Sequence, residues 1–169
     1  MHRHILFAAF ALIASGSAAI GDEVQGRILG YGIIKRPDSY RTIETPGTAS
    51  GHANLVDKPV VTVTTQKIPA KLGVRFGCFY EISNLPIADG EKVKLVRVTR
   101  CPALNKPDGS IFTGAELPLS YTVVRGRVEQ YTGFGFDHDY ELVPGTWTFE
   151  IRFGDKILCR QDFIISIGE

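Results

Sequence analysis

The sequence predicts an all-β protein, an immunoglobulin-like antiparallel β-sandwich of about seven to eight strands. Three observations point to this fold class. Short segments rich in β-branched and aromatic residues recur along the chain, separated by turns that contain glycine or proline. Apolar and polar residues alternate within several of these segments, as expected for strands with one buried face. No long stretch shows the 3.6-residue period of an amphipathic helix.

The first 21 residues are typical of a secretory signal peptide. Arg3 supplies a basic start, an apolar run covers residues 5–14, and small residues follow. Small residues at the −3 and −1 positions allow cleavage after Ala19 or after Gly21. An apolar run of about ten residues is too short to span a bilayer. We therefore expect a bacterial protein that is periplasmic or secreted, with no membrane insertion after cleavage.

The remaining residues, 22–169, are expected to form a single β-sandwich domain. The chain has 19 basic and 18 acidic residues. Cleavage removes Arg3, so 18 of each remain and the net charge of the mature chain is zero. A balanced charge argues against a dedicated nucleic-acid binder and against a polybasic membrane clamp.

The expected strands follow one another at the spacing typical of a sandwich. They are residues 24–34, 59–68, 73–82, 91–100, 119–136 split at Arg125-Gly126 into a hairpin, and a final hairpin within 144–165. The segment 105–110, NKPDGS, is expected to be a turn, because proline pre-sets φ and glycine permits positive φ. The polar stretch 35–54 is expected to be the longest structureless loop and hence a candidate binding loop.

The register of the final hairpin decides where Cys159 points. Trp147, Phe149, Ile151 and Phe153 share one face of the first strand. A simple two-residue Gly-Asp turn would pair Phe149 and Trp147 with charged residues and bring two charges into the core, which is costly. A shift of one residue, by a longer loop or a bulge, instead pairs Phe153 with Ile157, Ile151 with Cys159 and Trp147 with Phe163. We expect the shifted register, with Cys159 in the core.

Three cysteines remain after cleavage, Cys78, Cys101 and Cys159. An odd number in an oxidising compartment suggests one disulfide and one free thiol. Cys78 shares a face with the apolar residues of its strand, so a Cys78–Cys159 disulfide across the sandwich is the first choice. Cys101 is the alternative partner of Cys159, and three unpaired thiols are the remaining alternative.

Residues 136–141, FDHDYE, gather the only dense set of carboxylates around a histidine. Adjacent positions on an extended strand point in opposite directions, so these groups favour an acidic solvated loop over a metal site. We expect no cofactor. The residues proposed to line a binding loop are Tyr40, His52, Phe134, Phe136, Asp137 and His138, although aromatic residues of a sandwich belong more often to its core.

Motifs of catalysis are scarce. No Gly-x-Ser-x-Gly motif occurs, and the two histidines left after cleavage, His52 and His138, exclude a three-histidine zinc site within one chain. A catalytic triad assembled in space by these histidines is the basis of the hydrolase alternative.

The segments IPAKLGVRFGCFYEI, YTGFGFD and ELVPGTWTFEIRFGDKIL followed by QDF resemble a bacterial exported family known as domain of unknown function 3859. The likeness extends from about residue 26 to residue 163 and is sharpest from Tyr131 onward. The resemblance implies a small, exported, all-β domain and brings no catalytic residues. The cysteines and His52 lie outside its pattern.

Taken together, these patterns favour a non-catalytic binding or interaction module of the cell envelope. Its expected partner is an envelope protein or a small ligand, and the protein is expected to be a monomer. One alternative is an envelope assembly accessory that acts through exposed edge strands. The other is a small hydrolase, which requires Asp137 and His138 to meet a serine or a second carboxylate.

Overall fold

The computed structural model describes residues 23–35, 40–45, 47–49, 51–56 and 59–167. The expected signal peptide lies outside these ranges. The described residues form strands and one short 3₁₀ helix, η1 (Asp139–Glu141). The strands are β1 (Gln25–Lys35), β2 (Tyr40–Glu44), β3 (His52–Val56), β4 (Val60–Val63), β5 (Lys67–Pro69), β6 (Arg75–Ser83), β7 (Lys92–Asn105), β8 (Ile111–Thr122), β9 (Val128–Gly135), β10 (Gly145–Phe153) and β11 (Lys156–Ser166). Within the described part of the chain, no helix has the length and apolar character needed to cross a membrane.

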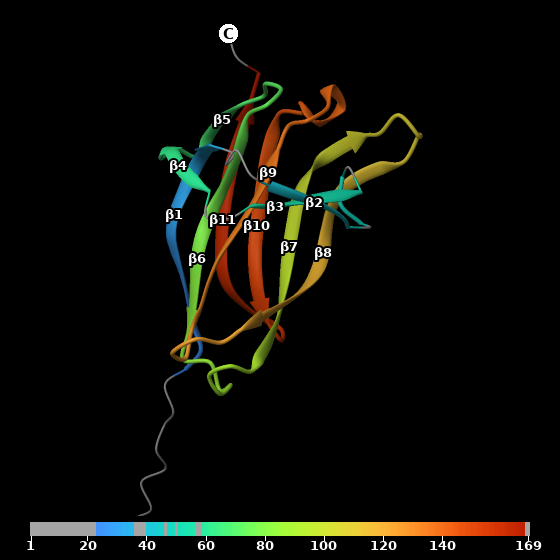
Figure 1. Ribbon diagram of the computed structural model, residues 1–169. Helices are drawn as coiled ribbons and strands as arrows, with labels where there is room; N and C mark the ends of the chain where they lie inside the picture. The colour runs from blue at the N-terminus through green and yellow to red at the C-terminus, as the bar shows by residue number, and fades with distance from the viewer. Residues whose placement is uncertain (1–22, 36–39, 46, 50, 57–58, 168–169) are drawn as a thin grey trace, which may run out of the picture.

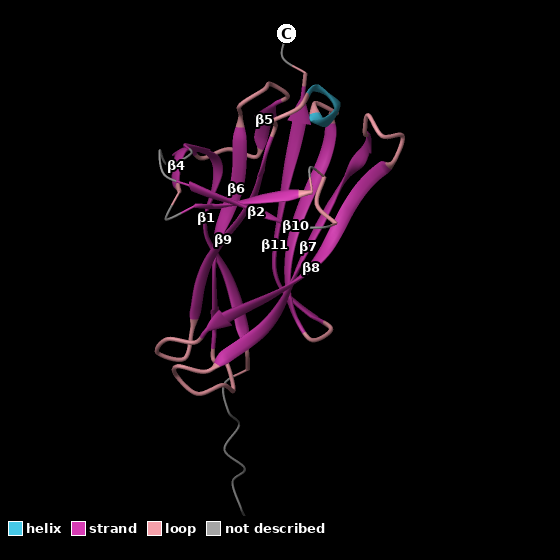
Figure 2. Ribbon diagram, turned by 45° about the vertical axis from the view of Figure 1, so that its right-hand side comes forward, coloured by secondary structure: helices cyan, strands magenta, loops and turns pink. Residues whose placement is uncertain are grey.

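Two sheets pack face to face (Figures 1 and 2). The first sheet has the order β4-β1-β6-β9 and the second has the order β5-β11-β10-β7-β8. Neighbouring strands are antiparallel, except that β5 runs parallel to β11. The all-β, immunoglobulin-like sandwich is thereby confirmed, with nine strands in its two sheets where seven to eight were expected.

The additional strands arise where no turn was predicted. The expected strand 59–68 divides into β4, which joins the first sheet, and β5, which joins the second. Strand β8 begins directly after the predicted NKPDGS turn, in which Gly109 adopts a φ of 82°. The predicted hairpin at Arg125-Gly126 is present, and both residues have positive φ, as a tight two-residue turn requires.

The prediction that residues 35–54 form a structureless loop is wrong. Strands β2 and β3 pair within it as an antiparallel hairpin, which crosses in front of the second sheet in Figure 1. The backbone N–H of Thr45 donates to the carbonyl of Gly51 at 2.8 Å, and Ala49 at the tip is fully buried. The polar composition of the segment concealed a hairpin whose tip closes one end of the core.

The register of the final hairpin is confirmed from Ile151 inward. Ile151 pairs with Cys159 and Trp147 with Phe163. The shift arises from a bulge next to Ile151, not from a longer loop, so Phe153 pairs with Lys156 and the predicted Phe153–Ile157 pair is wrong. Cys159 is 5% exposed and lies in the core.

The core divides into two clusters along the strands. The aromatic cluster consists of Ala49, Ile68, Phe76, Leu104, Phe136, Trp147, Phe149, Phe163 and Ile165. The aliphatic cluster consists of Tyr80, Ile82, Leu85, Val93, Leu95, Val123, Val128, Ile151 and Cys159. A single strand contributes to both, as β6 does with Phe76 and Tyr80, so the level where the clusters meet lies near Cys78.

Candidate ligand-binding site

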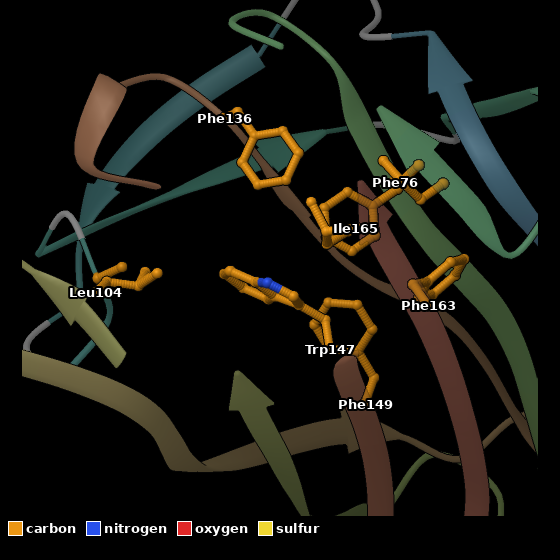
Figure 3. Packing of buried hydrophobic residues seen from close by; sticks show 9 residues of the cluster. Phe76, Leu104, Phe136, Trp147, Phe149, Phe163 and Ile165 are labelled. Atoms are coloured by element: carbon orange, nitrogen blue, oxygen red, sulfur yellow. The ribbon is translucent and has the colours of Figure 1, made fainter. Parts of the chain in front are cut away.

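The aromatic residues of the predicted binding loop belong to the core. Phe136 is fully buried and lies 5.4 Å from Phe76 between ring centroids. Phe134 is partly exposed and its ring lies 4.4 Å from that of Trp147. Figure 3 shows Phe136, Phe76 and Trp147 pointing toward one another. The proposed role of Phe136 in binding is therefore replaced by a packing role.

The polar residues of FDHDYE do not converge on one point. Asp137 forms an ion pair with Arg75 at 2.6 Å, and the His138 ring stacks on Tyr140 at 5.2 Å. Glu141 is buried, and its Oε2 accepts hydrogen bonds from the backbone N–H groups of Asp137 and His138 at 2.7 and 2.9 Å. Burial raises the pKa of Glu141 above its ordinary value. The segment is a capped turn, and no group of metal-binding side chains occurs among the described residues.

The two remaining residues of the predicted loop lie on the hairpin. Tyr40 begins β2, and His52, which is exposed, begins β3. His52 pairs with Glu44, at the far end of the hairpin from the Tyr40–Val56 pair. Asp137 and His138 follow β9 on the first sheet. The structure does not gather these residues into one catalytic arrangement.

The three cysteines are free thiols in the structure, so neither proposed disulfide is formed. Cys78 and Cys159 are both buried and face the interior from opposite sheets, as their positions on the strands predicted. Burial raises the pKa of Cys78 to about 12, with a smaller contribution from Cys159, and burial raises the pKa of Cys159 to about 11. These thiols are protonated at neutral pH and act as packing groups.

A layer of polar side chains lies between the sheets where the two hydrophobic clusters meet. On β7, Arg97 is the Cα partner of Ile151 and Thr99 is that of Phe149, so both face inward with those core residues. On β11, Gln161 lies between Phe163 and Cys159 on the same face. We call Arg97, Thr99, Gln161, Cys78 and Thr132 the polar layer.

Arg97 is the unusual member of this layer. Tyrosines surround it, and burial among them lowers the pKa of its guanidinium; Tyr121 and Tyr80 partly oppose that shift. Its Nε is buried without an acceptor. Of the ion pairs found in the described part of the chain, none includes Arg97. Arg97 as a whole is only partly buried, so its guanidinium keeps some contact with solvent while its Nε has no acceptor, and this arrangement calls for an explanation.

Two hydroxyls on the inner face of the first sheet also lack partners. The hydroxyl of Tyr80, a fully buried side chain, and Oγ1 of Thr132 have no hydrogen-bond partner. Thr132 pairs with Cys78, two residues from Tyr80, so these hydroxyls lie on the inner face of neighbouring strands. Tyr80 is close enough to Arg97 to influence its pKa. Burial, with a smaller contribution from the nearby Tyr121, raises the pKa of Tyr80 well above its ordinary value, so its hydroxyl keeps its proton. The site thus offers the Arg97 guanidinium and the Tyr80 hydroxyl.

The side of the sandwich next to Arg97 is partly open. Leu117, Leu119 and Tyr121 of the edge strand β8 pair with Arg97, Leu95 and Val93, so they face inward. Leu95 and Val93 are buried, whereas the three β8 residues remain partly exposed. Arg97 is partly exposed as well, so solvent reaches this part of the inner face. The tip of the β2–β3 hairpin lies beside it, because a Cβ at Gly47 would lie 4.0 Å from Leu117 Cδ2.

Sequence reasoning missed Arg97, because parity within its strand does not single it out. In KVKLVRVT, residues 92–99, Val93, Leu95, Arg97 and Thr99 share one face. The opposite face also has two apolar residues, Val96 and Val98. Only the pairing of Arg97 with Ile151 places the arginine on the inner face.

Comparisons with known proteins agree with this architecture. The model of the family Domain of unknown function (DUF3859) matches residues 23–165, and the chain therefore belongs to that family. No curated protein matches it. An immunoglobulin-like protein from Pseudomonas aeruginosa, known from a crystal structure, is similar with a TM-score of 0.57 and 23% identity, over 87% of this chain and 99% of that one. At this identity the likeness shows the fold.

A second similarity is too weak to carry an argument. The DNA glycosylase AlkC from Pseudomonas fluorescens, bound to DNA with an abasic-site analogue, has a TM-score of 0.37 and 15% identity. The match covers 60% of this chain and 28% of that one.

Proposed function

We propose that this protein is an exported, non-catalytic binding module of the cell envelope, and that it binds its ligand between the two sheets at Arg97. The observation that carries the proposal is the inward-facing guanidinium without an anionic partner. The signal-peptide pattern of residues 1–21 supports export. We propose that it acts as a monomer.

The chemistry around Arg97 supports binding over catalysis. Tyr80 and Cys78 have raised pKa values, the latter about 12, so both are protonated at neutral pH. A protonated phenol or thiol is neither a general base nor an activated nucleophile. Asp137 and His138, which the hydrolase alternative needs, are instead engaged in an ion pair and a ring stack.

Native mass spectrometry of the mature protein isolated from its own periplasm tests the proposal. The wild type is expected to carry an additional mass that is released on denaturation. Arg97→Met removes the guanidinium and keeps an unbranched apolar side chain, so the additional mass is expected to disappear. Arg100→Met is the matched control, because Arg100 is exposed on the same strand. Equal ligand retention by all three proteins would refute a site at Arg97.

A second function is favoured by the edge of the second sheet. Strand β8 has 12 residues and pairs only with β7, so its other edge offers backbone groups for strand addition by an envelope protein. Pro118, which has no N–H, and the exposed Glu116 weaken this edge as a docking strand. A photo-cross-linker at Ser120 in β8, compared with one at the exposed Ile164 in β11, which lies between β5 and β10, tests this function. A partner captured only from Ser120 supports strand addition, and equal capture from both positions contradicts it.

A further inference from the structure

The polar layer also indicates which class of ligand binds there. We infer that the site at Arg97 binds a small organic monocarboxylate with an apolar body. This inference rests on the proposed function and specifies its ligand.

The charge of the site selects an anion. Arg97 forms no ion pair, and its close ionisable neighbours, Tyr80 and Tyr121, are phenols. Since phenols are neutral at pH 7, the guanidinium charge is not balanced by the groups that face it. The planar fork of an arginine matches the two oxygens of a carboxylate, and the low dielectric between the sheets strengthens that pairing.

The donors of the site favour a carboxylate over a phosphate. Beside Arg97, the hydroxyl of Tyr80 has no hydrogen-bond partner. It can donate one hydrogen bond to an anionic oxygen. A dianionic phosphate usually requires several cationic side chains or a set of backbone N–H groups. One guanidinium balances a single negative charge, and the Tyr80 hydroxyl can donate to the same anion.

The approach to the site selects the rest of the ligand. The partly open side next to Arg97 is lined by Leu117, Leu119 and Tyr121, which face inward and are partly exposed. Leu95, the Cα partner of Leu119, is 1% exposed. An aliphatic or aromatic body would remove these apolar surfaces from water, and burial of each methylene group contributes about 0.8 kcal/mol. A ligand with a highly polar body would gain no hydrophobic stabilisation from these side chains.

The test is a titration of hexanoate, the probe, into the mature protein. Binding is monitored by calorimetry and by the chemical shifts of the backbone amides. Hexanamide has the same shape without the charge, and inorganic phosphate has charge without the apolar body. We expect hexanoate to bind at least tenfold more tightly than hexanamide, with saturable shifts at Arg97 and Tyr80. Arg97→Met should abolish this preference, and Arg100→Met should retain it.

Three results would overturn the inference. Equal binding of hexanamide and hexanoate would show that the charge is not recognised. Binding of phosphate but not of hexanoate would show that the site selects a different anion. Retention of the hexanoate preference by Arg97→Met would place the binding elsewhere. If the co-purified mass depends on Arg97 while hexanoate does not bind, the ligand class is wrong and the proposed function stands. If neither depends on Arg97, both fail.

Discussion

Arg97 and Ile151 are Cα partners on the neighbouring strands β7 and β10, so a guanidinium and a side chain that is 1% exposed share the inner face of one sheet. The register forces this arrangement, because every second residue of β7 faces the core. An arginine at such a position, without an ion pair among the described residues, gains no Coulombic stabilisation there. We interpret it as a residue retained for binding.

The buried carboxylate of Glu141 provides a prediction about pH. Its pKa is raised by burial, so the folded state holds the proton more tightly than the unfolded state does. Its contribution to stability is present below the ordinary pKa of 4.5 and is lost as the pH rises through the raised value. Glu141→Gln keeps an oxygen acceptor and removes this titration. The stability of the variant relative to the wild type should therefore increase as the pH rises above 4.5.

Glu141→Ala is the comparison that separates capping from titration. It removes the acceptor of the Asp137 and His138 N–H groups, so it should lower the free energy of unfolding by about 1 kcal/mol or more at every pH. Urea unfolding at several pH values measures both variants. A Gln variant as unstable as the Ala variant at pH 7 would show that the charge itself is required.

The thiols provide a prediction about reactivity. Burial raises the pKa of Cys78 and Cys101 to about 12 and that of Cys159 to about 11, and the thiolate is the reactive form. Iodoacetamide at pH 8 should therefore label the folded protein much more slowly than the unfolded protein. In denaturant without reductant, all three thiols should react. Labelling of only one thiol there would show that a disulfide joins the other two, contrary to the free thiols of the structure.

Gly133 provides a prediction about packing on the outer face of the first sheet. A Cβ at this position would meet the Tyr131 hydroxyl and the Phe76 carbonyl, whereas a Cβ at Gly30 would meet nothing within 4 Å. Gly133→Ala should therefore lower the free energy of unfolding by about 1–3 kcal/mol through overpacking. Gly30→Ala, the control in β1, should change it little. Thermal unfolding followed by circular dichroism measures both, and equal effects would contradict the close approach of Tyr131.

The sequence predicted the sandwich because its signals were local. Alternation identified the inner face of β10, and the cost of burying charge selected the Ile151–Cys159 pair. The β2–β3 hairpin was missed because its tip is stabilised by a contact distant in sequence, the burial of Ala49 in the aromatic cluster. Composition alone does not reveal such a contact.

The candidate site was harder to predict than the fold. Phe136 and His138 attracted attention as clustered aromatic and polar residues, but Phe136 fills the core and His138 stacks on Tyr140. Parity within its strand did not single out Arg97, because both faces of residues 92–99 carry two apolar side chains. Its inward position follows from the pairing with Ile151, and its surroundings from the opposite sheet, which contributes Tyr80.

The central claim is that Arg97 is retained for binding and not for stability. The most direct measurement is the free energy of unfolding of Arg97→Met in urea, without ligand, beside Arg100→Met. Arg97 faces inward, has no ion pair and is partly buried, so replacing it with an apolar side chain should leave the free energy of unfolding unchanged or raise it by up to about 1 kcal/mol, and the exposed Arg100 control should change it little. A loss of about 2 kcal/mol in Arg97→Met alone would show that the guanidinium supports the fold, and would contradict the claim.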